Sequence, residues 1–233
     1  MDTPWLYDER TQVGTDYADE SHVREYDAKM QRLRDIPREV ETAAQALSIS
    51  AETVVWEIGT GTGEMAIGLA PRCRYVYASD ISPAMLAPAR GKAAERGVRN
   101  VSFEPGGFLS GFTPPQLVGG VVSQLALHHL PDFWKQVALK RIARHLVPSG
   151  RLFLRDIVFN ADIADWDTHF GALVEGVRKT GGEAVAQETV AHIREEYSTF
   201  SWVLEEMLRR AGFDIVDRQQ AAPTTLYTCV LRG

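Results

Sequence analysis

The sequence predicts an α/β fold with a doubly wound, mainly parallel sheet of seven strands, an antiparallel last strand, and helices on both faces. Short apolar runs alternate with helical segments between residues 54 and 158, and such alternation implies right-handed crossovers between parallel strands. The first run leads into a glycine-rich turn at 59–63. Two closing runs, 213–216 and 225–231, are joined by a short connection with Pro223, which favours an antiparallel pair at the sheet edge.

Length and composition indicate one globular domain over residues 1–233, with 45% hydrophobic and 24% charged residues. The net charge of -6 favours a small-molecule acceptor over nucleic acid as partner, without excluding either. The sequence contains no apolar run near the roughly 18 residues that span a bilayer and begins with an acidic, mixed segment unlike a secretory signal. Its two cysteines are far apart. We therefore expect a cytoplasmic protein without membrane association, and the oligomeric state is left open.

The first elements form an expected N-terminal helical cover over about 1–48. Residues 1–20 show no clear period, and helices are predicted at 22–33 and 35–47. Asp35, Pro37 and Glu39 are typical of a helix start. The strands then follow at 54–58, 75–79, 101–103, 118–123 and 151–158, with helices at 64–70, at 132–146 and from Ser82 towards Gly97.

Residues 159–197 interrupt this alternation. They are expected to form a helical insertion that acts as a lid over a mostly apolar acceptor pocket, together with residues 1–30. A last helix is predicted from Thr199 to Ala211, where Gly212 stops it.

The most informative segment is Glu57-Ile58-Gly59-Thr60-Gly61-Thr62-Gly63-Glu64. Glycine allows positive φ and close approach of a ligand to the backbone. Asp80 ends the second predicted strand, where a carboxylate can accept hydrogen bonds from both ribose hydroxyls of a nucleoside. The dinucleotide pattern G-x-G-x-x-G has its third glycine where Glu64 stands here. Because two carboxylates flank the turn, we expect a cationic nucleoside without phosphate rather than NAD or FAD.

The chain resembles the class I S-adenosylmethionine-dependent methyltransferase family, which has a Rossmann-like sheet. The resemblance covers roughly residues 22–158 and continues into the C-terminal hairpin. It is carried by the stretches VVWEIGTGTG from Val54, DISPAML from Asp80, SQLALHHLP from Ser123 and LVPSGRL from Leu146. The resemblance implies S-adenosyl-L-methionine as cofactor, with S-adenosyl-L-homocysteine as product.

The resemblance also implies roles for the matching positions. Glu57 would orient the methionine ammonium, and Asp80 would bind the ribose. An acidic residue that contacts the adenine amine in the family is replaced by Gly107, so backbone groups near Phe108 would take over. The remaining expected cofactor contacts are Gly59, Thr60 and Gly61 beside the methionine part, Ile81 and Met85 beside the adenosine, and Gln124 after the fourth strand.

Two residues are candidates for catalysis. His128 lies at the carboxyl end of the fourth strand, and histidine is the usual base near pH 7. His129, beside Leu130-Pro131, is expected to be structural. Tyr26 is the aromatic candidate, from a Tyr-Asp pair that recurs in the family. No metal site is predicted, because the cluster of Asp162, Asp165 and Asp167 is more typical of a solvated helix face or a cap.

Two other functions remain open at this point. Gly107 motivates the alternative of a binding protein of the same fold that has lost methyl transfer, and the same cofactor can serve chemistry other than methylation. A nicotinamide oxidoreductase ranks behind both.

Overall fold

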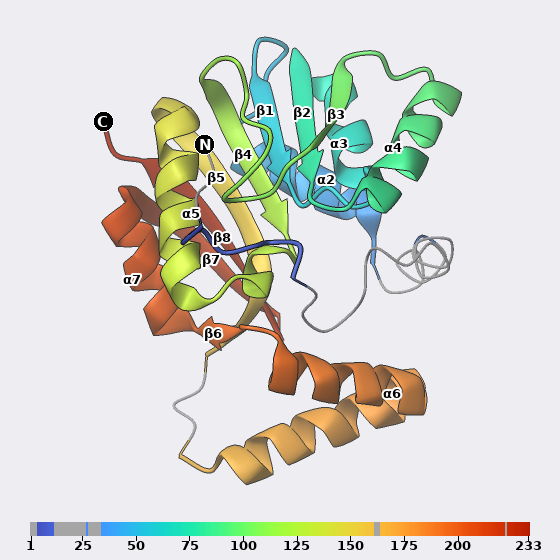
Figure 1. Ribbon diagram of the computed structural model, residues 1–233, viewed down its shortest axis with the longest axis vertical. Coiled ribbons are helices and arrows are strands. Elements are labelled where there is room, and N and C mark those ends of the chain that lie inside the picture. The colour runs from blue at the N-terminus through green and yellow to red at the C-terminus, as the bar shows by residue number, and fades with distance from the viewer. Residues whose placement is uncertain (1–3, 12–26, 28–33, 161–163, 222) are drawn as a thin grey trace.

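The computed structural model describes residues 4–11, 27, 34–160, 164–221 and 223–233. Within these residues it contains an eight-stranded sheet with the order β3-β2-β1-β4-β5-β8-β7, and β6 pairs with β5 beside this path (Figure 1). The strands are β1 (Val54–Ile58), β2 (Tyr75–Asp80), β3 (Val101–Pro105), β4 (Val118–Gln124), β5 (Leu146–Phe159), β6 (Thr199–Phe200), β7 (Phe213–Ala221) and β8 (Thr224–Leu231). The predicted α/β architecture is confirmed, with an antiparallel β8 among otherwise parallel strands.

The last strand, β8, lies between β5 and β7 and is antiparallel to both, as predicted, so β7 itself runs with the parallel strands. The sheet differs from the prediction in having eight strands in place of seven. A helix was predicted from Thr199, but Thr199 and Phe200 form the short β6, paired with Val158 and Phe159. The helix starts only at Ser201.

Helices cover both faces of the sheet (Figure 1). The core on one face includes α5 (Asp132–His145) and α7 (Ser201–Ala211), and the core on the other includes α2 (Ile36–Ala46), α3 (Glu64–Leu69) and α4 (Pro83–Glu95). Alternate residues of one strand point to opposite faces. Trp56 accordingly packs in the core with α5 and α7, whereas Val55 packs with α2, α3 and α4.

Local signals in the sequence explain where these helices begin and end. The Asp35 side chain accepts a hydrogen bond from the Arg38 N–H at 3.2 Å, and Ser82 caps α4 in the same way at the Met85 N–H. Gly212 ends α7 with a φ of 105°, a conformation that glycine adopts without steric cost. The predicted helix at 22–33 lies outside the described residues, except for Asp27, which is helical.

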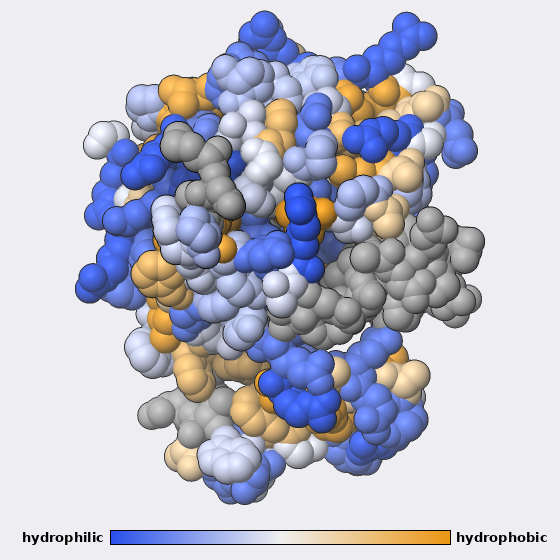
Figure 2. Space-filling view, in the orientation of Figure 1, coloured by the Kyte–Doolittle hydropathy of each residue, from blue (hydrophilic) through white to orange (hydrophobic). Residues whose placement is uncertain are grey.

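The segment after β5 forms the long α6 (Trp166–Glu195), which projects from one end of the sheet at the bottom of Figure 1. Gly182 has a φ of 85° and divides α6 into two helical arms. Ala186 is the one residue of α6 that is buried. Polar residues cover most of the face in Figure 2, including much of α6. No helix in the described part of the chain is long and apolar enough to cross a membrane.

Candidate active site

The glycine turn after β1 shapes the floor of the site. Gly61 has a φ of 54° and lines the cavities described below, and Gly59 has a φ of 76°, where a Cβ would lie 2.5 Å from the Cβ of Ala126. The N–H groups of Gly59 and Thr60 both donate to the Ser79 carbonyl, at 2.9 and 3.0 Å. These bonds tie the turn to the end of β2 and bring Asp80 next to it.

Two adjoining cavities lie at the carboxyl ends of β1, β2 and β4. The larger has a volume of about 480 Å³, within the range of small-molecule sites. Residues 9–11 of the N-terminal segment also line it. The smaller, of about 50 Å³, lies beside the glycine turn. All ten predicted cofactor residues line one or both cavities: Glu57, Gly59, Thr60, Gly61, Asp80, Ile81, Met85, Gly107, Phe108 and Gln124.

Asp80 is held in place by the backbone on either side of it. One carboxylate oxygen accepts from the Gly61 N–H at 2.7 Å and the other from the Ser82 N–H at 2.8 Å. Burial raises the pKa of this carboxyl group, while these hydrogen bonds oppose the shift. Each oxygen keeps a lone pair for a further donor. A pair of ribose hydroxyls therefore matches Asp80, which lines the larger cavity.

Glu57 lies at the smaller cavity and is almost fully buried. Its Oε2 accepts from the Thr60 hydroxyl at 2.7 Å. Burial raises the pKa of Glu57 to about 8, although Thr60 and the charge of Arg34 oppose the shift. A buried acid of this kind favours a cationic ligand, because a positive charge beside it restores the ionised form. A ligand ammonium meets this requirement.

Arg34 is a site residue that the sequence did not reveal. It lines the smaller cavity with Glu57 and Gln124. Its guanidinium donates to the Gln124 Oε1 and pairs with Glu39, where Nε lies 3.0 Å from Oε2. The Gln124 Nε2 is buried without a hydrogen-bond partner among the described residues. The smaller cavity thus combines a carboxylate with donors, which suits the ammonium and carboxylate of an amino acid.

Glu64 does not act as the sequence suggested. Its carboxylate is paired with Lys92 at 2.9 Å and with Arg96 at 2.8 Å, and these cations lower its pKa against the effect of burial. A neutralised Glu64 repels a phosphate only weakly. The electrostatic selection of a cationic ligand therefore depends on Glu57, which has no such ion pair among the described residues.

Glu9 occupies the space that Gly107 leaves open. A Cβ at Gly107 would lie 2.4 Å from the Glu9 Oε2. The Glu9 carboxylate accepts four hydrogen bonds from residues 108–110: from the Phe108 N–H at 2.6 Å, the Leu109 N–H at 3.0 Å, and the N–H and hydroxyl of Ser110 at 2.8 and 2.7 Å. An acid from about a hundred positions earlier in the chain thus lies beside position 107. Sequence reasoning missed Glu9, because nothing local marks it.

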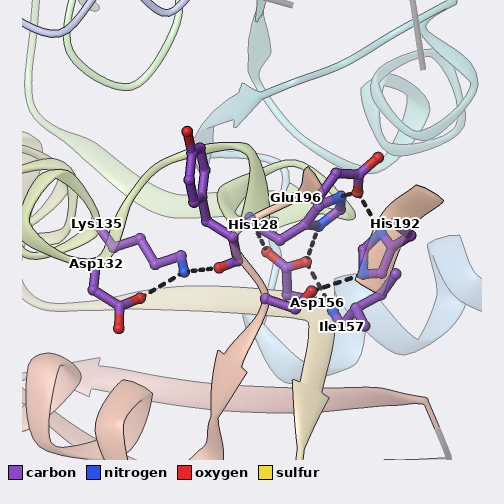
Figure 3. A network of polar contacts seen from close by, with 9 residues as sticks. His128, Asp132, Lys135, Asp156, Ile157, His192 and Glu196 are labelled. Carbon is purple, nitrogen blue, oxygen red and sulfur yellow. Dashed lines mark hydrogen bonds and ion pairs between the residues drawn. The ribbon is translucent and has the colours of Figure 1, made fainter. Parts of the chain in front are cut away.

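The structure places the two histidines differently from the expectation. His128 is buried and does not line the larger cavity, whereas His129 does. Both ring nitrogens of His128 have carboxylate partners, Nδ1 at Asp156 and Nε2 at Glu196, the latter at 3.1 Å (Figure 3). Burial opposes a charged ring, yet the two carboxylates outweigh it and raise the pKa of His128 to about 9. His128 therefore lacks the exposed nitrogen that a base acting on a substrate requires.

His129 has the opposite electrostatic environment. Burial and the neighbouring charge of His128 lower the pKa of His129 to about 4, so its ring is neutral near pH 7. The network around His128 continues through Glu196 to His192 (Figure 3). A histidine and a glutamate four residues apart lie on one side of a helix, and this spacing in 192–196 was the signal available in the sequence.

The lid expected at 159–197 is not what the structure shows. No described residue of α6 lines the larger cavity. The cover comes instead from Glu9, Arg10 and Thr11, while α6 projects away from the sheet (Figure 1).

The other candidates have simpler outcomes. Asp165 caps α6 by accepting from the Thr168 N–H at 3.0 Å, as expected for a cap. Tyr26 and Asp162 lie outside the described residues.

Comparison with known proteins agrees with this geometry. A family model described as a methyltransferase domain matches residues 55–150. The uncharacterized methyltransferase GK2543 of Geobacillus kaustophilus is 30% identical over 203 residues, which is 87% of this chain and 88% of that protein.

Two solved structures share the fold. The N-methyltransferase NodS from Bradyrhizobium japonicum, in complex with S-adenosyl-L-homocysteine, superposes with a TM-score of 0.58 at 20% identity, over 87% of this chain and 91% of NodS. The [4+2]-cyclase SpnF superposes with a TM-score of 0.65 at 18% identity, over 84% of this chain and 80% of SpnF.

Proposed function

Because this chain belongs to the class I S-adenosylmethionine-dependent methyltransferases, we propose that it transfers the methyl group to an oxygen, nitrogen or carbon atom of a small molecule. The observation that carries the proposal is the continuity of the larger cavity. It runs from Asp80 and Gly61, which suit the cofactor, to an apolar wall of Leu125, Ala126 and Leu130. A cavity of about 480 Å³ suits a cofactor and a compact acceptor better than a polymer.

The residues of the two cavities fit the cofactor in two parts. Asp80, Ile81 and Met85 in the larger cavity suit the adenosine, since a carboxylate can bind the ribose and apolar groups can pack on the base. Glu57 and Arg34 in the smaller cavity suit the ammonium and the carboxylate of the methionine part. When bound, the cofactor supplies an electrophilic methyl group on a sulfonium. The protein contributes by holding both reactants in one orientation, which removes much of the entropic barrier.

Glu9 supports this assignment and weakens the alternative of a protein without transfer activity. That alternative was motivated by Gly107, which lacks the acid that would meet the adenine amine. The Glu9 Oε2 accepts a single described hydrogen bond, from Phe108, and Glu9 lines the cavity. A carboxylate oxygen can accept a further one. We infer that Glu9 accepts the adenine amine in place of a residue at position 107.

Incubation with S-adenosylmethionine and a panel of small hydroxyl, amine and carbon acceptors tests the proposal. The expected product is heavier than its acceptor by one CH₂ group, with one equivalent of S-adenosylhomocysteine formed. The Asp80→Ala variant is the negative control, because it removes the ribose partner. A product of unchanged mass would indicate rearrangement or cyclisation. Methylation of RNA or protein but of no small molecule would refute the acceptor class.

A further inference from the structure

Three groups with the chemistry of metal ligands meet beside the larger cavity. His128 and His129 lie in the short 3-10 turn Leu127–His129 after β4, and Glu196 follows the end of α6. One ligand atom from each of the three lies within 4.8 Å of the other two. We propose that His128, His129 and Glu196 bind a first-row divalent cation, with Zn²⁺ or Co²⁺ as representative ions.

The spacing of two of these groups already suits a metal. The His128 Nε2 lies 3.1 Å from the Glu196 Oε2. In a tetrahedral zinc site with bonds near 2.1 Å, two ligand atoms are about 3.4 Å apart. The separation of the His128–Glu196 pair therefore already matches that of two ligands of one cation. A ring nitrogen of His129 lies within 4.8 Å of both, so a change of its side-chain rotamer has to bring it closer by up to about 1.4 Å.

Each of two proposed ligands has a partner that would orient it. The Asp156 carboxylate bonds to the His128 Nδ1 through one oxygen and accepts the His128 N–H at 3.0 Å through the other. A carboxylate on Nδ1 directs Nε2 towards the metal in many histidine-ligated sites. Glu196 in turn contacts the His192 Nδ1, and the second ring nitrogen of His192 bonds to the Ser198 hydroxyl at 2.7 Å.

Backbone and side-chain contacts hold the segment with Glu196 against the turn with the histidines. The Tyr197 N–H donates to the His128 carbonyl at 2.9 Å. Lys135 bonds to the Tyr197 carbonyl and to Asp132, at 2.8 Å for the second contact (Figure 3). Preorganised ligands lose little conformational freedom on binding. The site thus does not depend on movement of the projecting arms of α6.

The charges and the location point in the same direction. Asp156 and the side chain of Glu196 are both buried, with exposed fractions of 2% and 6%. Two carboxylates in this buried network face the single charge of the His128 ring, whereas a divalent cation would balance both of them. His129 lines the larger cavity. With three protein ligands, a fourth position would remain for water or an acceptor atom, as in catalytic rather than structural zinc sites.

A metal titration of the 233-residue chain, first treated with a chelator, tests the proposal. Co²⁺ is expected to bind at one equivalent per chain and to give the visible absorption bands of four- or five-coordinate Co²⁺, which Zn²⁺ then displaces. Glu196→Gln should weaken Zn²⁺ binding about 100-fold, because a proposed ligand is lost. Glu195→Gln is the matched control. It removes the same charge from the adjacent, exposed residue and should bind Zn²⁺ as the parent protein does.

Absence of a stoichiometric Co²⁺ complex in the parent protein would overturn the proposal, without any need for a variant. Equal affinities of Glu196→Gln and Glu195→Gln would do the same, since the metal would then be bound elsewhere. S-adenosylhomocysteine binding, measured in parallel, separates this site from the proposed function. If the parent protein did not bind S-adenosylhomocysteine, the cofactor assignment would be wrong. If it bound S-adenosylhomocysteine but not Co²⁺, only the metal site would be refuted.

Discussion

Replacement of Glu9 by Gln is the sharpest test of how the cofactor cavity is covered. The carboxylate accepts four hydrogen bonds, three at Oε1 and one from Phe108 at Oε2. An amide can keep the oxygen at the Oε1 position, but its NH₂ group then faces the Phe108 N–H. The charge-assisted hydrogen bond from the Phe108 N–H is lost, and this N–H then faces the amide NH₂ group, a second donor. The proposed acceptor for the adenine amine is also lost.

The size of the effect follows from these contacts. A hydrogen bond to a charged group contributes about 1.5–3 kcal/mol, and each 1.4 kcal/mol corresponds to about a tenfold change in affinity. We therefore expect Glu9→Gln to weaken S-adenosylhomocysteine binding by about ten- to a hundredfold. Isothermal titration calorimetry measures this change directly. Asp8→Asn is the matched control, because Asp8 is the adjacent acid and is exposed.

A second ligand distinguishes an adenine contact from a general loosening of the segment. S-inosylhomocysteine carries an oxygen in place of the adenine amine. The parent protein should prefer the adenosine compound, and Glu9→Gln should lose most of that preference. If Glu9→Gln bound S-adenosylhomocysteine as tightly as Asp8→Asn, or kept the full preference for the amine, the reasoning about Glu9 would be refuted.

Three further outcomes follow from the structure. Since burial raises the pKa of Glu57 to about 8, S-adenosylhomocysteine affinity in calorimetry should rise by up to about tenfold per unit between pH 6 and 8, and Glu57→Gln should flatten this rise. The Glu57 carboxyl group binds its proton more tightly in the folded protein than in the unfolded chain, where its pKa is near 4.5. The contribution of Glu57 to the free energy of unfolding should therefore fall as the pH rises from about 4.5 to 8. Chemical denaturation at several pH values would contradict this expectation if Glu57→Gln showed the same pH dependence as the parent protein. Gly107→Ala should weaken S-adenosylhomocysteine binding about tenfold, because the new Cβ would lie 2.4 Å from the Glu9 Oε2, and it should add little in a Glu9→Ala background, which lacks the atoms that this Cβ would contact; fully additive losses would disprove this coupling. Leu139→Ala, at a fully buried position in α5, should lower the free energy of unfolding by about 2–5 kcal/mol in urea titrations. A loss below about 1 kcal/mol would contradict tight packing of the core around Leu139.

The elements that the sequence predicted correctly are those with local signals. Asp35 and Ser82 cap their helices as expected, and the spacing between Gly61 and Asp80 corresponds to a direct hydrogen bond. Such features depend on neighbouring residues or on one strand–turn–helix unit, whose geometry is nearly fixed. The short strand at Thr199 was missed because its pairing with β5 is a tertiary contact that overrides helix propensity.

The unpredicted site residues all reach the site from distant parts of the chain. Glu9 bonds to the loop at residues 108–110, and Arg34 contacts Gln124. Glu196 meets His128 only because α6 returns to the end of β4. The spacing of His192 and Glu196 indicates that these two side chains lie together, but periodicity and motif spacing do not reveal which distant element they contact. The role of His128 was misjudged for the same reason, since nothing near it in sequence reveals the two carboxylates that enclose its ring.

The anchoring of α6 at one end has a consequence for how this protein can diversify. Its C-terminal end is fixed by contacts of residues 196–199 with His128, Asp132 and Lys135. The first arm, before Gly182, projects from the sheet (Figure 1) and contacts it near its start, where Phe170 packs against Phe159 of β5. Substitutions or length changes in that arm lie outside the contacts that fix the C-terminal end of α6. Such changes can therefore accumulate without disturbing the glycine turn after β1. Replacement of the arm before Gly182 by a foreign helix should leave the affinity for the cofactor unchanged.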